Sequence, residues 1–293
     1  MIGYLENLSW YLFVDFNPIC IADTNNNHCF QSEQHLCTGD MRCFAFLTRD
    51  LVMIAVITDN QDACLEVYNM KPAPSQQRPL CTFFLPEGGQ NSLVIDLSIS
   101  SDTSSRPHPT APFSISFQDK LFTVTYETTA QDGENTLKAL LFLPMSTIVS
   151  HLDTPYVAGW EQEIPWEQWG PHGAHFISLD HKLSDVWVCH TYGMKFVLAC
   201  RPTPEGQFRS VRLYDFNHLP TRRDCLSYGK SAGLLINSNI IEASDEMFAE
   251  SVHMHLPCRC IQKDLPVCED GRYEAIMMSE DSLIAVAVGH STP

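Results

Sequence analysis

The sequence predicts an all-β fold of the propeller type, in which four-stranded antiparallel sheets are arranged as blades. Apolar runs of strand length dominate the chain, helix-like patterns are nearly absent, and one hairpin pattern recurs four times. Four-stranded units repeated along a chain are typical of propeller blades. We therefore expect residues 1–293 to form a single β-propeller-like domain with about four recognisable blades.

The recurring hairpin consists of two apolar strands joined by a short polar turn. In its first copy, a strand expected at 43–47 turns at Thr48-Arg49-Asp50 into a second strand at 51–57. The other copies are expected at 113–126, 186–200 and 275–288.

Each of the first three hairpins is followed by a further expected strand. These following strands lie at 65–68, 137–142 and 211–214. Upstream strands are expected at 92–98, 175–179 and 252–256. The repeating unit is thus a strand and a loop, then three strands separated by short turns, which is the layout of a propeller blade.

The two ends of the chain each contribute part of a unit. A strand expected near 11–15 has no hairpin before it, and the fourth hairpin has no outer strand after it. We therefore expect the termini to share one blade, which removes an exposed sheet edge. Hairpins spaced roughly 70–90 residues apart exceed the ~40–50 of common propeller repeats. An incomplete ring and a β-sandwich with irregular hairpins stay open for that reason.

The charge balance limits the classes of partner. The chain has 35 acidic and 18 basic residues, a formal net charge of −17. Such a surface repels phosphate backbones and anionic lipid, so we expect no nucleic-acid or membrane partner. The start lacks a basic segment, and no apolar run approaches the ~20 residues of a membrane span. Twelve cysteines scattered through strand-like patterns favour free thiols, and an intracellular place in the cytoplasm or nucleus.

A tryptophan-rich segment is the candidate partner-binding site. Trp160, Trp166 and Trp169 crowd a segment that also contains His172. Aromatic side chains on a loop of a propeller face are typical anchors for a protein partner. The alternative is that Trp166 and Trp169 wedge between two blades and lock them together, and the strand that follows directly favours this packing interpretation.

Two patterns at residues 229–233 resemble catalytic motifs but lack a required part. Gly229-Lys230-Ser231 would end a phosphate-binding loop, yet Asp224 stands where that motif requires glycine. The same stretch fits a Gly-x-Ser-x-Gly nucleophile elbow. The segment 234–236 indicates a strand, however, where the elbow requires a helix.

Residues of the types that bind metals, and pairs of acidic residues, also occur, but their spacing is not that of a known metal or catalytic motif. The metal-ligand types are His253, His255, Cys258, Cys260 and Cys268. Their Cys-x-Cys spacing differs from that of zinc knuckles. The pairs Glu161 with Glu163 and Glu242 with Glu246 could serve glycoside hydrolysis if they lay ~5–10 Å apart. Because acids are abundant, solvated surface is the favoured interpretation, and we expect no catalytic residue, metal or cofactor.

Four segments carry a family resemblance. They are Ile164 to Pro171, Asp185 to Met194, Val211 to Asn217 and Leu256 to Asp281. Together they resemble the C-terminal propeller-like region of F-box proteins from mushroom-forming (basidiomycete) fungi, over roughly residues 140–290. In that family a helical F-box would recruit a ubiquitin-ligase core, and the propeller-like region would present a target. No Leu-Pro-rich helical segment precedes the first expected strand, so only the propeller-like half carries over.

The expected function is that of a non-enzymatic protein-interaction scaffold. It would resemble the substrate-recognition half of an F-box-type ubiquitin-ligase adaptor, with an unidentified protein partner and no cofactor. Two alternatives stay open: a propeller enzyme acting on glycosides, and a truncated relative with no retained function.

Overall fold

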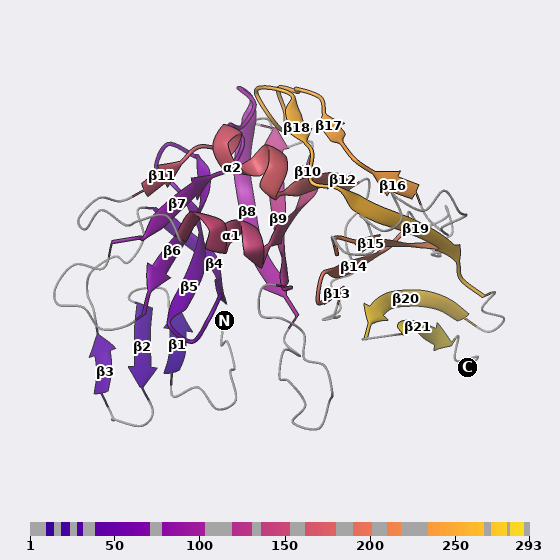
Figure 1. Cartoon of the computed structure of the whole chain (residues 1–293), viewed down its shortest axis with the longest axis horizontal. Helices are drawn as coiled ribbons and strands as arrows, with labels where there is room; N and C mark the ends of the chain where they lie inside the picture. Colours follow the sequence, from indigo (N-terminus) through magenta and orange to yellow (C-terminus); the bar gives the residue numbers. More distant parts are fainter. Residues whose placement is uncertain are drawn as a thin grey trace.

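The computed structural model shows a chain that is mostly β-strand, in several antiparallel sheets with two short helices (Figure 1). This confirms the all-β expectation. The structure describes residues 10–14, 19–23, 28–31, 39–70, 78–102, 119–130, 136–152, 162–179, 190–200, 210–217, 234–266, 271–279 and 282–289.

Three of the sheets formed by the described residues come mainly from the N-terminal half of the chain, although two of their strands lie within residues 162–179. The first is antiparallel and consists of β1 (Trp10–Val14), β2 (Ile19–Asp23) and β3 (His28–Gln31). The second, here the β5 sheet, has the order β11 (Gln162–Ile164), β7 (Cys81–Phe84), β6 (Ala63–Asn69), β5 (Leu51–Ile57), β4 (Asp40–Phe46). The third, here the β10 sheet, has the order β12 (His175–Leu179), β10 (Thr136–Pro144), β9 (Leu121–Ala130), β8 (Ser92–Ser101).

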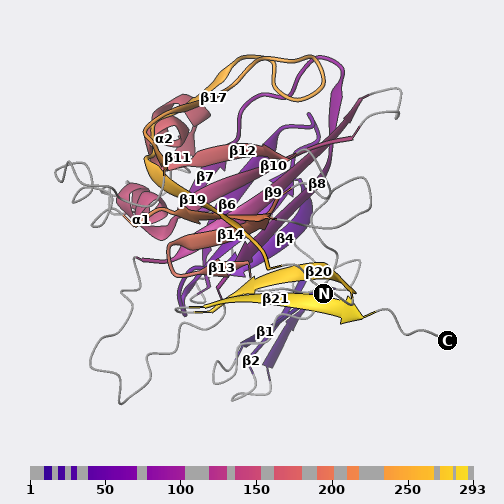
Figure 2. The ribbon, with the colours of Figure 1, turned by 90° about the vertical axis from the view of Figure 1, so that its right-hand side faces the viewer.

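The C-terminal half contains one large sheet and two hairpins. The large sheet, here the β14 sheet, has the order β13 (Thr191–Tyr192), β14 (Lys195–Ala199), β15 (Ser210–Asp215), β19 (Cys258–Asp264), β16 (Leu234–Ile236). The hairpins are β17 (Asn239–Ile241) with β18 (Val252–Met254), and β20 (Gly271–Met278) with β21 (Leu283–Gly289). In the turned view, β20 and β21 lie side by side in front of the other layers (Figure 2).

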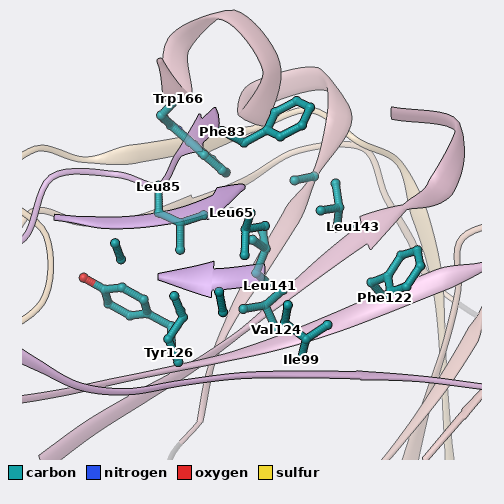
Figure 3. Packing of buried hydrophobic residues seen from close by; sticks show 14 of the residues in the cluster. Leu65, Phe83, Leu85, Ile99, Phe122, Val124, Tyr126, Leu141, Leu143 and Trp166 are labelled. Atoms are coloured by element: carbon teal, nitrogen blue, oxygen red, sulfur yellow. The ribbon is translucent and has the colours of Figure 1, made fainter. Parts of the chain in front are cut away.

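The β10 sheet is buried on both faces. Successive strand residues point to opposite sides of the sheet, and over most of β10 both sets are apolar. On β10, Leu141 and Leu143 pack into a core shared with the β5 sheet, whereas Leu140 and Phe142 pack into a core shared with the β14 sheet. Figure 3 shows the first of these cores, where side chains of β9 and β10 lie near Leu65 and Phe83. The sheet is therefore a middle layer in a stack.

The β14 sheet repeats this arrangement one layer further along the stack. Phe196 and Leu198 of β14 pack toward the β10 sheet, and Val197 between them packs with Ile276 and Met278 of β20. The stacked layers thus follow the order of the chain from the β5 sheet to the β20–β21 hairpin (Figure 1).

The first and fourth predicted hairpins are confirmed. In the first, β4 pairs with β5 and β5 with β6, and the hydroxyl of Thr48 accepts hydrogen bonds from the backbone N–H groups of Asp50 and Leu51, both at 3.0 Å. In the fourth, β20 pairs with β21 across a bulge between Tyr273 and Ala275. Apolar runs of strand length and a polar turn identify both hairpins in the sequence.

The inner strands expected at 113–117 and 186–189 lie outside the described residues. Both edges of β9 are occupied by its partners β8 and β10. The strand expected at 92–98 is part of β8. It pairs directly with β9, which contains the second strand of the hairpin predicted at 113–126. Within the described residues no ladder joins β1 to β21, since β1 pairs with β2 and β21 with β20.

The segment 175–179 forms the expected strand but belongs to a different sheet from the one predicted. We expected it to open the third unit, yet β12 pairs with β10, with Ile177 opposite Leu140. In this place both faces of β12 are buried, because Phe176 packs in the core toward the β5 sheet and Ile177 in the core toward the β14 sheet. The fourth main strand of the β14 sheet is instead β19, where no strand was predicted.

Two helices, α1 (Met145–Leu152) and α2 (Trp166–Gly173), complete the described chain. Each has eight residues, and neither is long and apolar enough to cross a membrane.

Candidate interaction site around helix α2

Helix α2 contains three of the four residues of the predicted partner-binding site, namely Trp166, Trp169 and His172. Eight residues are too few for a helix that is stable by itself, so tertiary contacts must hold it. Pro165 precedes the first turn in an extended conformation, and its carbonyl accepts a hydrogen bond from the Gln168 N–H at 3.0 Å. The helix ends where the Ala174 N–H donates to the Gly170 carbonyl at 2.9 Å.

The two tryptophans of α2 are buried, with exposed fractions of 6% for Trp166 and 2% for Trp169. Their rings meet edge to face at 5.0 Å. Trp169 also packs on Phe83 of β7 at 5.3 Å, and its indole N–H donates to the Phe84 carbonyl at 3.0 Å. Trp166 packs on Phe176 of β12 at 5.4 Å. The indoles therefore join the β5 sheet to the β10 sheet.

Two glycines of α2 are required by close packing. A Cβ atom at Gly170 would lie 2.2 Å from the ring of Trp166, and one at Gly173 would lie 2.4 Å from the methyl group of Thr147. The hydroxyl of Thr147 donates to the Gly173 carbonyl at 2.7 Å and fastens α2 to α1. The Trp-x-x-Trp-Gly segment is thus shaped by the core beneath it.

The opposite side of α2 faces solvent and is polar. Glu167, Gln168 and His172 are exposed there. His255, which follows β18, lies beside them, with its ring centre 5.1 Å from that of His172. We call the exposed residues Glu163, Glu167, Gln168, His172 and His255 the α2 surface.

The structure thus separates the predicted site residues. Trp160 lies outside the described residues. Trp166 and Trp169 are brought together in the core, and His172 alone of the four is exposed within the described part of the chain. His255 was not predicted for this site. The alternation of buried Met254 and Leu256 around it is the signal that places it at the surface.

The other chemical candidates do not form a site among the described residues. His253 and His255 are exposed while Cys258 is fully buried, and no group of three or more His, Cys, Asp or Glu gathers as a metal site there. Of the paired acids, Glu163 and Glu242 are exposed and Glu246 is half-buried. Glu161, Cys268 and the segment 229–233 lie outside the described residues.

Several buried polar groups serve the packing. The phenol of Tyr68 donates to the carboxylate of fully buried Glu66 at 2.6 Å. His175 is also fully buried, with its Nδ1 3.1 Å from the Leu256 carbonyl. Burial lowers the pKa of His175 and raises the pKa values of the Cys81 and Cys258 thiols to about 12, so these groups are neutral near pH 7. A neutral buried thiol is a poor nucleophile.

No protein-family model, curated protein or solved structure matches this chain.

Proposed function

We propose that this chain is a non-enzymatic protein-interaction scaffold with a β-propeller-like arrangement of sheets. The observation that supports it most is the burial of successive sheets on both faces, as for Leu141 and Phe142 of β10. Blades of a propeller pack face to face in this way. In such a fold the packed sheets provide rigidity, and the exposed connections between them are available for a partner.

The use of aromatic and polar groups supports a scaffold rather than an enzyme. The indole N–H of Trp169 and the carboxylate of Glu66 are both satisfied within the packed layers. The thiols of Cys81 and Cys258 are held neutral by burial. These four groups are thus part of the core and are not presented to a substrate.

The partner is a protein, and the α2 surface is the place where it binds. This surface carries the carboxylates of Glu163 and Glu167 beside Gln168 and His172, on a chain whose net charge is −17. A basic patch on the partner complements such a surface and speeds the encounter. The resemblance to F-box proteins favours a cytoplasmic or nuclear role in presenting a target to a ubiquitin-ligase core.

Affinity capture from the native cell tests this proposal, with the wild-type chain compared with Glu167→Lys. We expect the wild type to retain a ubiquitin-ligase adaptor and Glu167→Lys to retain markedly less, because the reversed charge opposes a basic partner. Asp264→Lys is the matched control, because it makes the same charge change at an exposed residue of β19. Equal capture by all three chains, or capture without any ligase component, would contradict the proposal.

A further inference from the structure

Two exposed histidines from distant parts of the chain meet at the end of α2. His172 lies in the last turn of α2, and His255 follows the end of β18. Their ring centres are 5.1 Å apart and their ring planes differ by 32°. Both residues are exposed, and within the described part of the chain neither imidazole takes part in a hydrogen bond or an ion pair.

The backbone that holds the two histidines is fixed by contacts on both sides. The N–H of His255 donates directly to the carbonyl of Pro171, the residue before His172. The indole of Trp169 anchors α2 below, and the buried side chains of Met254 and Leu256 anchor the chain on each side of His255. The backbone positions of the two histidines are therefore set in advance, which favours a binding site for a small ion.

The spacing of the rings matches that of two imidazoles on one metal ion. A metal–nitrogen bond of about 2.0 Å places each ring centre about 3.2 Å from the metal. Ring centres are then about 4.5 Å apart for neighbouring ligands of a square-planar ion such as copper(II), and about 5.2 Å apart for a tetrahedral ion such as zinc(II). The distance observed between His172 and His255 is 5.1 Å.

We propose that His172 and His255 together bind one divalent transition-metal ion of the copper(II) and zinc(II) class. Imidazole nitrogen suits these ions, and copper(II) binds tightest among the divalent first-row metals. No third His, Cys, Asp or Glu joins the pair within the described residues, so water fills the remaining positions. The ion links α2 to the segment after β18, and its open positions are available to a ligand from a partner.

Titration of the full chain with copper(II), followed by calorimetry and electron paramagnetic resonance, tests this site. We expect one site with two nitrogen ligands, and a roughly ten-fold or larger loss of affinity in His172→Gln and in His255→Gln, because each removes one ligand. His253→Gln is the matched control, since His253 is also exposed on the same segment. Its affinity should stay within about two-fold of the wild type.

Two results would overturn the proposal. One is a wild-type affinity weaker than about 100 µM, which a lone surface imidazole could supply. The other is copper binding that survives His172→Gln or His255→Gln while His253→Gln removes it. Circular dichroism of each variant, matched to the wild type, shows that a loss of binding is not a loss of fold.

Discussion

His175 is fully buried at the start of β12, between the β10 sheet and the β14 sheet. Its Nδ1 donates to the Leu256 carbonyl, and its Nε2 has no hydrogen-bond partner within the described residues. Burial lowers its pKa, although the bond to Leu256 acts in the opposite direction. The folded chain therefore holds this imidazole neutral, whereas the unfolded chain protonates it near its ordinary pKa of 6.5.

This difference predicts that the free energy of unfolding falls as the pH drops below about 6.5, because the unfolded state then binds the additional proton. The contribution of His175 is at most about 1.4 kcal/mol per pH unit. Urea denaturation at pH 7.5 and at pH 5.5 measures it, and His175→Phe should reduce the pH dependence. An unchanged slope in His175→Phe would contradict this account of the buried imidazole.

Gly170 provides a second prediction for a single residue. Replacing it with alanine places a methyl group against the ring of Trp166, at a position only 2.2 Å from the nearest ring atom. We expect Gly170→Ala to lower the free energy of unfolding by about 1–3 kcal/mol through overpacking. Gln168→Ala in the same helix is exposed and should change it by less than about 0.5 kcal/mol. Equal stability of the two variants in chemical denaturation would show that the close contact does not exist.

At the scale of elements, the sequence predicted the hairpins better than their grouping into sheets. The run of buried residues in β5 and the polar turn before it are local signals, so their hairpin could be predicted. The placement of β12 could not, because its alternating residues fit either neighbouring sheet. Only the long-range pairing of Ile177 with Leu140 decides between them.

The candidate site could likewise be predicted from the sequence only in part. The crowding of tryptophans was visible in the sequence, but which side of α2 they occupy depends on its contacts with β7 and β12. The neighbour of His172 in space is His255, far along the chain, and no local pattern indicates that contact. The exposure of His255 alone could be predicted, from the buried residues on each side of it.

Helix α2 is fastened to the β5 sheet chiefly by Trp169. Trp169→Phe keeps an aromatic ring beside Phe83 but removes the donor to the Phe84 carbonyl. We expect a loss of about 1–3 kcal/mol in the free energy of unfolding, since the part-buried carbonyl then lacks its partner. Trp166→Phe is the control, because the structure shows no hydrogen bond from that indole among the described residues. If both substitutions lower the free energy of unfolding by the same amount in guanidinium denaturation, the hydrogen bond from Trp169 does not stabilise the fold.

At the scale of the whole molecule, the sheets are stacked in layers in a fixed order. Each inner sheet has one neighbour on each face, and the cores on the two sides of β10 are separate. The β20–β21 hairpin differs, because Leu283, Ile284 and Val286 of β21 are exposed. A stack of this kind predicts that protection from solvent is highest in the middle layer and lower at the β20–β21 hairpin.

Hydrogen exchange of the native chain, followed by mass spectrometry, tests that order most directly. We expect the slowest exchange for peptides covering β9 and β10, and exchange at least roughly ten-fold faster for peptides covering β21. Uniform protection across these peptides, or β21 exchanging as slowly as β10, would contradict a stack of sheets with the β10 sheet at its centre.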